Sequence, residues 1–357
     1  MRSKLLTLSL IALVSAGCHK ADNNAATQSE DFASLKQSVL TDFTANVAVA
    51  GYKDLDDQSV KLYTSLQALN DNPTEQNLAN ARTEWKSMRT IWEQCEGFLF
   101  GPVEDNDYDP NMDTWPTDYV QMDSLLASNN NLEVSDVQNL TLSLRGYHPI
   151  EYIIFGNHGD RTAASLTTRQ KKYMMSLAED IKTTCHAVYT SWTQAPTSFG
   201  NMVTTAGNGS TVYAKKQEVY LAIIGAMTDI CDEVGNGKMK EPYDAQDPKI
   251  VESPYSGTSL NDFKNNLIGL QNVYLGRYKT DGRGLSDLVA AKNKDLDNRL
   301  QAQITAAVNS FDNVTIPYEQ AIISQRVAVA TIMQTLNTLQ TTLEGELKPF
   351  IIQNITD

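Results

Sequence analysis

The sequence has few of the residues that build the best-known catalytic and structural metal sites. Its 357 residues include four cysteines and four histidines, without a C-x-x-C pair or an H-E-x-x-H motif. The first absence excludes a zinc ribbon, and the second excludes the zinc-protease helix in which two histidines bind the metal. A G-x-S-x-G turn is also missing, so the sequence does not indicate a serine hydrolase with a nucleophile elbow.

Clusters of basic residues are missing as well. The chain has 29 Lys and Arg residues against 43 Asp and Glu residues, which gives a formal net charge of −14. We therefore expect no nucleic-acid partner, because phosphate binding needs grouped cationic side chains. An acidic surface is compatible with the capture of cations, or simply with solubility.

Long apolar runs are absent beyond the N-terminus. After Arg2 and Lys4, residues 5–14 are mainly apolar, and three small residues then precede Cys18. This pattern is typical of a signal peptide over residues 1–17, followed by a lipidated Cys18. Ser15 stands where leucine is usual, so an ordinary signal peptide with a different cut is the alternative. We expect an exported protein that is lipid-anchored to the bacterial cell envelope, at the periplasmic or surface face of the outer membrane.

Strand patterns are scarce, and apolar residues recur through most of the chain at the helical period of about 3.6 residues. We predict an all-α fold. Thr74 is the expected N-cap of a long helix that is broken at Gly101–Pro102. The other helices are expected near residues 32–49, 55–69, 136–145, 149–155, 167–194, 211–235, 259–275, 285–312 and 316–346.

The predicted helices are expected to form two helical-bundle domains. Residues 18–30 are a lipidated cysteine and a polar tether, residues 31–200 form the first domain, and residues 201–357 form the second. The Gly-, Asn- and Thr-containing stretch 195–210 is the candidate boundary. In each half an aromatic helix end with Gly is followed by an Arg-Gly pair, which suggests an internal duplication.

Three cysteines remain besides Cys18. Cys95, Cys185 and Cys231 lie far apart in the sequence. One disulfide in an oxidising compartment and three buried thiols are both compatible with this spacing.

The sharpest local pattern is R-G-Y-H-P-I-E at residues 145–151. His148 and Glu151 are three residues apart at the start of a predicted helix, so their side chains can converge on one metal ion or act as an acid–base pair. Alternatively, Pro149 takes the first helical position, which makes His148 the N-cap and Glu151 a capping-box residue. The spacing alone does not separate these interpretations.

Several segments resemble the imelysin-like family, and they occur in the same order. G-Y-H-P-I-E at 146–151 looks like its G-x-H-x-x-E signature, and W-E-Q-C-E-G-F-L-F-G-P-V at 92–103 resembles its helix ending in Gly-Pro. D-T-W-P-T-D at 113–118 is similar to its Trp-Pro-x-Asp element. Y-S-G-T-S-L-N-D at 255–262 and N-V-Y-L-G at 272–276 are similar to its Ser-containing loop and the helix that follows.

The resemblance implies a site where two helical domains meet. The implied metal ligands are His148, Glu151, Glu96 and Asp118, and the implied ligand-binding residues are Ser256, Asp262 and Trp115. The ordinary alternatives are a surface charge for Glu96, a helix cap for Asp118, a first-turn carboxylate for Asp262, a loop hydroxyl for Ser256 and a core position for Trp115.

The loop at 253–255 departs from the family's iron-regulated members, whose loop is richer in His and acidic residues. Ser253, Pro254 and Tyr255 stand there instead. This departure argues against a second domain rich in metal ligands.

The resulting hypothesis is a binding protein. We expect it to bind one divalent or ferric metal ion, iron in the first place and zinc as the alternative, or a small ligand, in a cleft between the domains. It would serve metal uptake with an envelope transporter as partner, act as a monomer, and contact the membrane only through its lipid anchor. The alternatives are a metallopeptidase of the imelysin family, in which Glu151 and His148 would be catalytic, and a non-catalytic helical scaffold.

Overall fold

The computed structural model describes residues 31–194 and 197–356. The predicted signal peptide, the lipidation site Cys18 and the tether therefore lie outside the described residues. From Phe32 onward the chain packs as one compact unit. Within these residues the fold is all-helical, as predicted, and the one β-type pairing is an isolated bridge between Arg277 and Asp281. None of the described helices is long and apolar enough to cross a membrane.

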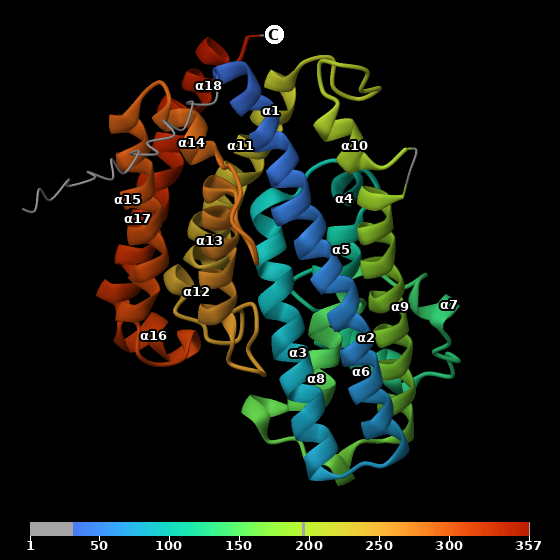
Figure 1. Cartoon of the computed structure of the whole chain (residues 1–357). Helices are drawn as coiled ribbons and strands as arrows, with labels where there is room; N and C mark the ends of the chain where they lie inside the picture. Colours follow the sequence, from blue (N-terminus) through green and yellow to red (C-terminus); the bar gives the residue numbers. More distant parts are fainter. Residues whose placement is uncertain (1–30, 195–196, 357) are drawn as a thin grey trace, which may run out of the picture. The chain divides into compact units, whose positions relative to one another are not determined.

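Long helices make up most of the first half of the described chain. The chain opens with α1 (Phe32–Asp42), the π-helical η1 (Phe43–Val49) and α2 (Ala50–Asp71), which follow one another without the predicted break. The next helix, α3 (Glu75–Cys95), begins where the Thr74 hydroxyl accepts a hydrogen bond from the Asn77 backbone at 3.2 Å, so the predicted N-cap is confirmed. Helix α2 packs against both α3 and α9 (Thr168–Thr193) (Figure 1).

Short helices connect α3 to α9. The predicted helix over 136–145 is wrong: this stretch contains only two single turns, and only Val137 and Leu144 within those turns are buried. Such a short apolar set cannot hold a continuous helix against the core. The connecting elements are η2 (Glu96–Phe98), α4 (Pro102–Asp105), α5 (Tyr108–Asp113), α6 (Tyr119–Ala127), α7 (Val134–Val137), η3 (Leu142–Leu144), α8 (Tyr147–Phe155), η4 (Asn157–Gly159) and η5 (Ala163–Ser165).

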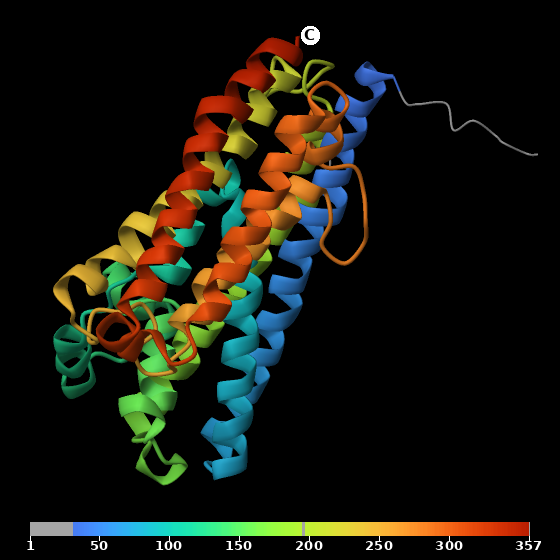
Figure 2. The same ribbon diagram turned by 90° about the vertical axis from the view of Figure 1, so that its left-hand side faces the viewer.

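The second half begins with α10 (Phe199–Thr204), which lies inside the predicted boundary stretch, and continues with helices that pack side by side, such as α15 and α17 (Figure 2). The predicted helix 259–275 is confirmed, whereas the prediction over 285–312 is interrupted where Asn293 caps a new helix by accepting from the Leu296 backbone. The elements are α11 (Lys216–Asp232), η6 (Glu233–Lys238), α12 (Lys240–Ala245), α13 (Ser259–Leu275), α14 (Leu285–Ala290), α15 (Lys294–Ser310), η7 (Phe311–Asn313), α16 (Tyr318–Ser324), α17 (Arg326–Thr342), η8 (Leu343–Leu347) and α18 (Lys348–Asn354).

Helix α13 lies directly against the end of α3. A Cβ atom on Gly97 would lie 2.6 Å from the backbone nitrogen of Leu270, and a Cβ atom on Gly269 would lie 2.2 Å from the carbonyl oxygen of Gln94. The two glycines therefore let the two backbones touch. This contact brings the charged C-terminal end of α3 next to the polar face of α13. The division into two domains and the internal duplication stay predictions.

The three described cysteines are buried and form no disulfide with one another. Burial raises the pKa of the thiols of Cys95, Cys185 and Cys231. Of the two alternatives that the spacing left open, the structure has three buried thiols.

Candidate metal centre

Gly146 determines how the G-Y-H-P-I-E segment enters its helix. It is the N-cap of α8 and has a φ of 81°, a conformation that favours glycine. A Cβ atom at this position would lie 1.9 Å from the carbonyl oxygen of Met112. Because no side chain intervenes, the first turn of α8 packs against the last turn of α5. Asp113 at the end of α5 thereby comes next to His148.

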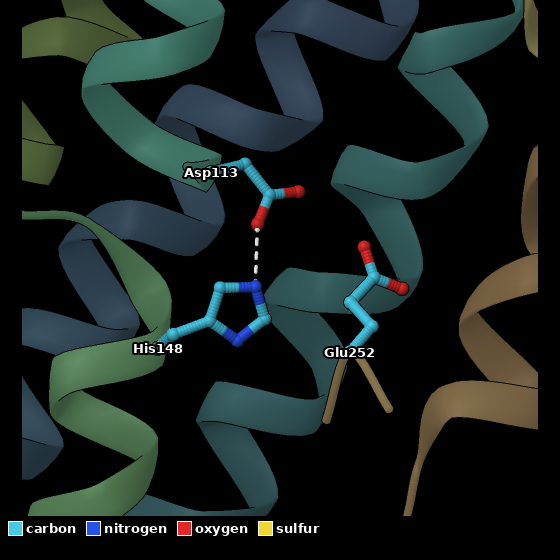
Figure 3. A group of neighbouring side chains, drawn as sticks. All are labelled: Asp113, His148 and Glu252. Carbon is cyan, nitrogen blue, oxygen red and sulfur yellow. Dashed lines mark ion pairs between the residues drawn. The ribbon is translucent and has the colours of Figure 1, made fainter. Parts of the chain in front are cut away.

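His148 is fully buried between two carboxylates. Its Nε2 atom lies 3.1 Å from Oδ1 of Asp113, and its Nδ1 atom lies 3.2 Å from Oε2 of Glu151 (Figure 3 shows the contact with Asp113). Burial alone would lower the pKa of His148, but the contacts with Asp113 and Glu151 outweigh it and raise that pKa to about 9. In the metal-free protein the imidazole is therefore a cation near neutral pH.

Glu151 does not cap its own helix. Its Oε1 atom accepts hydrogen bonds from the backbone nitrogens of Tyr255 and Ser256, at 3.1 and 2.7 Å, and from the Ser256 hydroxyl at 2.7 Å. The capping-box interpretation is therefore wrong, since Gly146 is the N-cap and the carboxylate of Glu151 binds a distant loop. Both oxygens of Glu151 have protein partners, one in this loop and one in the imidazole of His148.

Arg89 supplies a fixed positive charge in the same cluster. Its side chain on α3 is fully buried and contacts the carboxylates of Glu93 and Asp113, with Glu252 at 3.5 Å. Burial lowers the pKa of Arg89, but the surrounding carboxylates outweigh it and hold that pKa well above its usual value. Asp113 is held from its other side, because its Oδ2 atom accepts a hydrogen bond from the Trp92 indole at 2.7 Å.

Lys238 supplies a second cation from the opposite half of the sequence. Its ammonium group lies 2.9 Å from Glu252, 3.1 Å from Glu233, 3.3 Å from Glu96 and 4.0 Å from Glu93. Burial would lower the pKa of Lys238, but these carboxylates raise it well above its usual value. The ammonium group is therefore charged throughout the physiological range.

Glu96, one of the expected metal ligands, lies inside this cluster. The side-chain amide of Asn266 on α13 donates to Oε2 of Glu96 at 2.5 Å and to Oε2 of Glu93 at 2.7 Å. Burial, and next the charge of Glu93, raises the pKa of Glu96 well above its usual value. Two buried carboxylates thus share one buried amide.

Asp262 lies in the first turn of α13 and is fully buried. Its Oδ2 atom accepts hydrogen bonds from the hydroxyls of Ser253 and Thr258, at 2.8 and 2.9 Å, while its Oδ1 atom has no hydrogen-bond partner among the described residues. Burial raises the pKa of Asp262 to about 8, although Arg89 acts in the opposite direction. An uncompensated oxygen of this kind can accept a proton or a metal ion.

The remaining expected site residues have separate hydrogen-bond partners. Asp118 is the N-cap of α6, where its Oδ1 atom accepts from the Gln121 backbone at 2.8 Å. The half-buried indole of Trp115 donates to the carbonyl of Val251 at 3.2 Å. The backbone nitrogen and the hydroxyl of Ser256 both donate to Glu151. The aspartate that contacts His148 is Asp113, five residues before the one that the resemblance implied.

Sequence reasoning missed several charged residues of the cluster. Arg89 and Glu93 lie on the buried stripe of α3 that also carries Trp85 and Trp92. Charged residues on the same helical stripe as tryptophans could have indicated a buried charge cluster. A charged side chain is almost never buried unless it is paired. Glu252 immediately precedes the loop that looked poor in metal ligands, so the second half does contribute a buried carboxylate.

The donor atoms fit a cation. Among the described residues, three overlapping groups have ligand atoms within 4.8 Å of one another: Asp113, His148 and Glu252; Glu93, Glu96 and Asp113; and Glu93, Glu252 and Asp262. Glu252 is 1% exposed, and its Oε2 atom has no hydrogen-bond partner among the residues described. In Figure 3 its carboxylate lies near that of Asp113.

The cluster has more negative than positive groups. Six carboxyl groups, all with buried side chains, face three cationic groups. The carboxyl groups are those of Glu93, Glu96, Asp113, Glu151, Glu252 and Asp262, and the cations are Arg89, Lys238 and His148. Such an excess of buried negative charge must be neutralised by bound protons or by an additional cation.

Comparisons with known proteins agree with this architecture. Residues 48–345 match the family described as imelysin (Peptidase_M75). Iron-regulated protein A of Synechococcus elongatus is 27% identical over 324 residues, which are 89% of this chain and 87% of that protein.

Two solved structures have the same fold. The first, described as an iron-regulated protein A precursor from Parabacteroides distasonis, has a TM-score of 0.81 and 22% identity, and the match covers 90% of this chain and 95% of that one. The second, an imelysin-like protein from Psychrobacter arcticum, has a TM-score of 0.73 and 14% identity, with 89% and 95% covered.

Proposed function

Because this chain belongs to the imelysin family, we propose that it binds a metal ion at the buried cluster around His148 and serves metal uptake at the cell envelope. Iron is the first candidate for the bound ion. Two relatives carry the name iron-regulated protein A, and the N-terminal sequence pattern is that of an exported lipoprotein.

One observation carries the proposal, namely the orientation of His148 by Glu151. The Nδ1 atom of His148 faces Glu151, and its Nε2 atom faces Asp113. The possible ligand atoms of His148, Asp113 and Glu252 lie within 4.8 Å of one another. A carboxylate behind a histidine is the usual arrangement around protein metal ions, because it fixes the ring and makes the other nitrogen a better ligand. His148, Asp113 and Glu252 would hold the ion, which would supply the missing positive charge.

The donor chemistry supports iron more than the alternatives. The three donor groups contain carboxylate oxygens and one imidazole, without a thiolate. Oxygen-rich sites with a single imidazole suit iron and manganese, whereas thiolates favour Cu(I) and many zinc sites. Zinc stays the second candidate, since histidine and carboxylates also bind it.

The burial of the donors favours an ion over a peptide. The side chains of Asp113, His148 and Glu252 are each 1% exposed or less. A peptidase must bring a peptide bond to its metal and a water molecule, which requires an open groove. An ion, or a ligand of comparable size, needs only a brief opening of the structure.

Calorimetric titration of the chelator-treated full chain with Fe²⁺ under anaerobic conditions, and separately with Zn²⁺, tests the proposal. We expect binding, together with an increase in the melting temperature, because a ligand that binds only the native state stabilises it. His148→Ala is expected to remove both responses. His186→Ala is the matched control, since the His186 side chain is 65% exposed and contacts Asp56.

Each other outcome has a definite meaning. If the native chain binds neither ion, the cluster is an architectural ion-pair network and the proposal fails. If His148→Ala and His186→Ala bind equally well, the metal lies elsewhere. Cleavage of casein that depends on metal and on Glu151 would favour the peptidase instead.

A further inference from the structure

Lys238 occupies the boundary between the buried cluster and the solvent. Three of its partners, Glu93, Glu96 and Glu252, have side chains that are 3% exposed or less. The fourth, Glu233, is 49% exposed. The ammonium group therefore contacts the interior carboxylates and a surface carboxylate at the same time.

The same interior carboxylates belong to the candidate metal donors. Glu93 and Glu252 occur together in one donor group, and Glu93 and Glu96 occur together in another. An ammonium group and a metal ion cannot share these oxygens without strong mutual repulsion, because charges a few ångströms apart in a protein interior interact strongly. A metal ion at this side of the cluster therefore competes with Lys238.

The cluster also has an acceptor that Lys238 leaves unused. Glu252 contacts the ammonium group through Oε1, and its buried Oε2 atom has no hydrogen-bond partner among the described residues. Oδ1 of Asp262 is also buried without a hydrogen-bond partner among the described residues, and Asp262 belongs with Glu252 to one set of possible metal ligands. These unpartnered oxygens are independent signs that the cluster takes up a cationic ligand.

On these grounds we propose that Lys238 is a tethered counter-ion that holds the acidic side of the site until a multivalent metal ion displaces its ammonium group towards Glu233. This inference rests on the proposed metal-binding function and adds a specificity determinant to it. The comparison with Arg89 explains why Lys238 is the movable cation. The Arg89 side chain is 0% exposed and is enclosed by carboxylates, whereas Lys238 already has a surface partner.

The local backbone is compatible with this movement. Lys238 ends the π-helical segment η6, which begins at Glu233 and contains Gly235 and Gly237. A Cβ atom on Gly237 would contact no described heavy atom within 4 Å, so this side of the residue next to Lys238 faces open space. π-helical turns interrupt the regular helical hydrogen bonds and often occur at functional sites. The long lysine side chain can then move its charge outwards without moving α11.

Displacement of a lysine implies selection by ionic charge. A monovalent ion brings no more charge than the ammonium group that it replaces, so the exchange gains nothing for the cluster. A divalent or trivalent ion brings additional positive charge to an over-acidic interior and can offset the lost lysine contacts. Lys238 is therefore expected to exclude Na⁺ and K⁺ while it admits Fe²⁺.

The first test compares Lys238→Met with Lys240→Met by calorimetric titration of the full chain with Fe²⁺. Lys240 is a matched control because it is half exposed and pairs with Asp244 outside the cluster. Lys238→Met is expected to bind Fe²⁺ more tightly, by roughly tenfold or more, because no resident cation must leave. Fe²⁺ binding by Lys238→Met should also be weakened more by NaCl than by choline chloride at equal ionic strength.

The second test uses the unaltered protein and does not depend on the folding of a variant. The Lys238 amine is labelled with acetic anhydride, and the labelled peptide is quantified by mass spectrometry with and without Fe²⁺. We expect protection in the metal-free protein and increased labelling with Fe²⁺, whereas an immobile structural lysine would show no change.

The outcomes separate this inference from the proposed function. Equal or weaker Fe²⁺ binding by Lys238→Met, or Lys238 labelling that Fe²⁺ does not change, would overturn the displacement of Lys238 while the metal site stands. If the native chain binds no metal, the proposed function and this inference fail together.

Discussion

Oε1 of Glu151 accepts hydrogen bonds from both the backbone nitrogen and the hydroxyl of Ser256, each at 2.7 Å. The other oxygen of the same carboxylate faces His148. The orientation of the imidazole is therefore tied to the loop that follows Glu252. Residues from both halves of the sequence meet in this one contact.

Glu151→Gln tests whether this carboxylate orients the histidine. The amide oxygen can still accept from the loop, so the fold should persist, but the polarising charge behind the ring is lost. We expect affinity for Fe²⁺ to fall by roughly 10- to 100-fold, as is typical when a partner of a metal-binding histidine is removed. Calorimetry measures the change. Unaltered affinity would show that Glu151 has only a structural role.

Asp113→Asn and Asp118→Asn separate the aspartate in the cluster from the one that caps α6. Asp113→Asn is expected to abolish Fe²⁺ binding, because it removes a charged donor beside His148. Asp118→Asn should leave binding and stability nearly unchanged, because asparagine is as good an N-cap as aspartate. Calorimetric titration with Fe²⁺ and thermal melting of both variants test this expectation. The reverse pattern would place the metal site at α6.

Gly146→Ala should destabilise the protein strongly. The added methyl group would meet the Met112 carbonyl at 1.9 Å, and the residue would keep a φ of 81°. Strain and overpacking together predict a loss of about 3 kcal/mol in the free energy of unfolding, measured by urea denaturation. Gly209→Ala isolates the backbone effect, because its φ is 96° but its Cβ would meet nothing within 4 Å. Equal losses in the two variants would contradict the packing argument.

The metal-free protein should become less stable as the pH rises from about 4 to about 9, with Asp262 contributing up to about pH 8 and His148 from about pH 6.5. The pKa of His148 is raised from 6.5 to about 9, and that of Asp262 is raised from 3.8 to about 8. In both groups the folded state binds the proton more tightly than the unfolded state. Their contribution to the free energy of unfolding is complete below the pKa of the unfolded state. It is lost as the pH rises through the pKa of the folded state.

Melting temperatures of the chelator-treated chain across this pH range measure the effect. His148→Gln should show a shallower decrease than the native protein. A melting temperature that is constant or rises up to pH 9 would contradict the proposed protonation of the cluster. Asp113 acts in the opposite sense, since its pKa lies below the usual range and its contribution is lost in strong acid.

The long helices could be predicted from the sequence because their apolar residues recur at helical spacing. The predicted range 259–275 coincides with α13, and the predicted cap Thr74 is the N-cap of α3. The prediction over 136–145 was wrong because spacing does not reveal whether a segment finds a surface to pack against. The interruption at Asn293 was missed because a single side-chain cap decides it.

The centre of the site could be predicted only in part. His148, Glu96 and Asp262 lie in the buried cluster, and Ser256 contacts it through Glu151. Asp113 stood inside a recognised motif, but a linear pattern does not show which of its two aspartates turns inwards. That choice depends on Gly146, which lets the α5 and α8 backbones touch. The place of Lys238 in the cluster depends on contacts with residues far away in the sequence, which a local sequence pattern does not reveal.

The near-complete burial of Asp113, His148 and Glu252 has a kinetic consequence. An ion cannot collide with these donors directly, so loading must wait for a spontaneous local opening of the protein. The observed loading rate should then level off at high metal concentration, at the frequency of that opening. Release from the proposed site would wait for the same event, which would give a bound ion a long residence time. A partner that opens this region would therefore speed up the release of an ion bound at the proposed site.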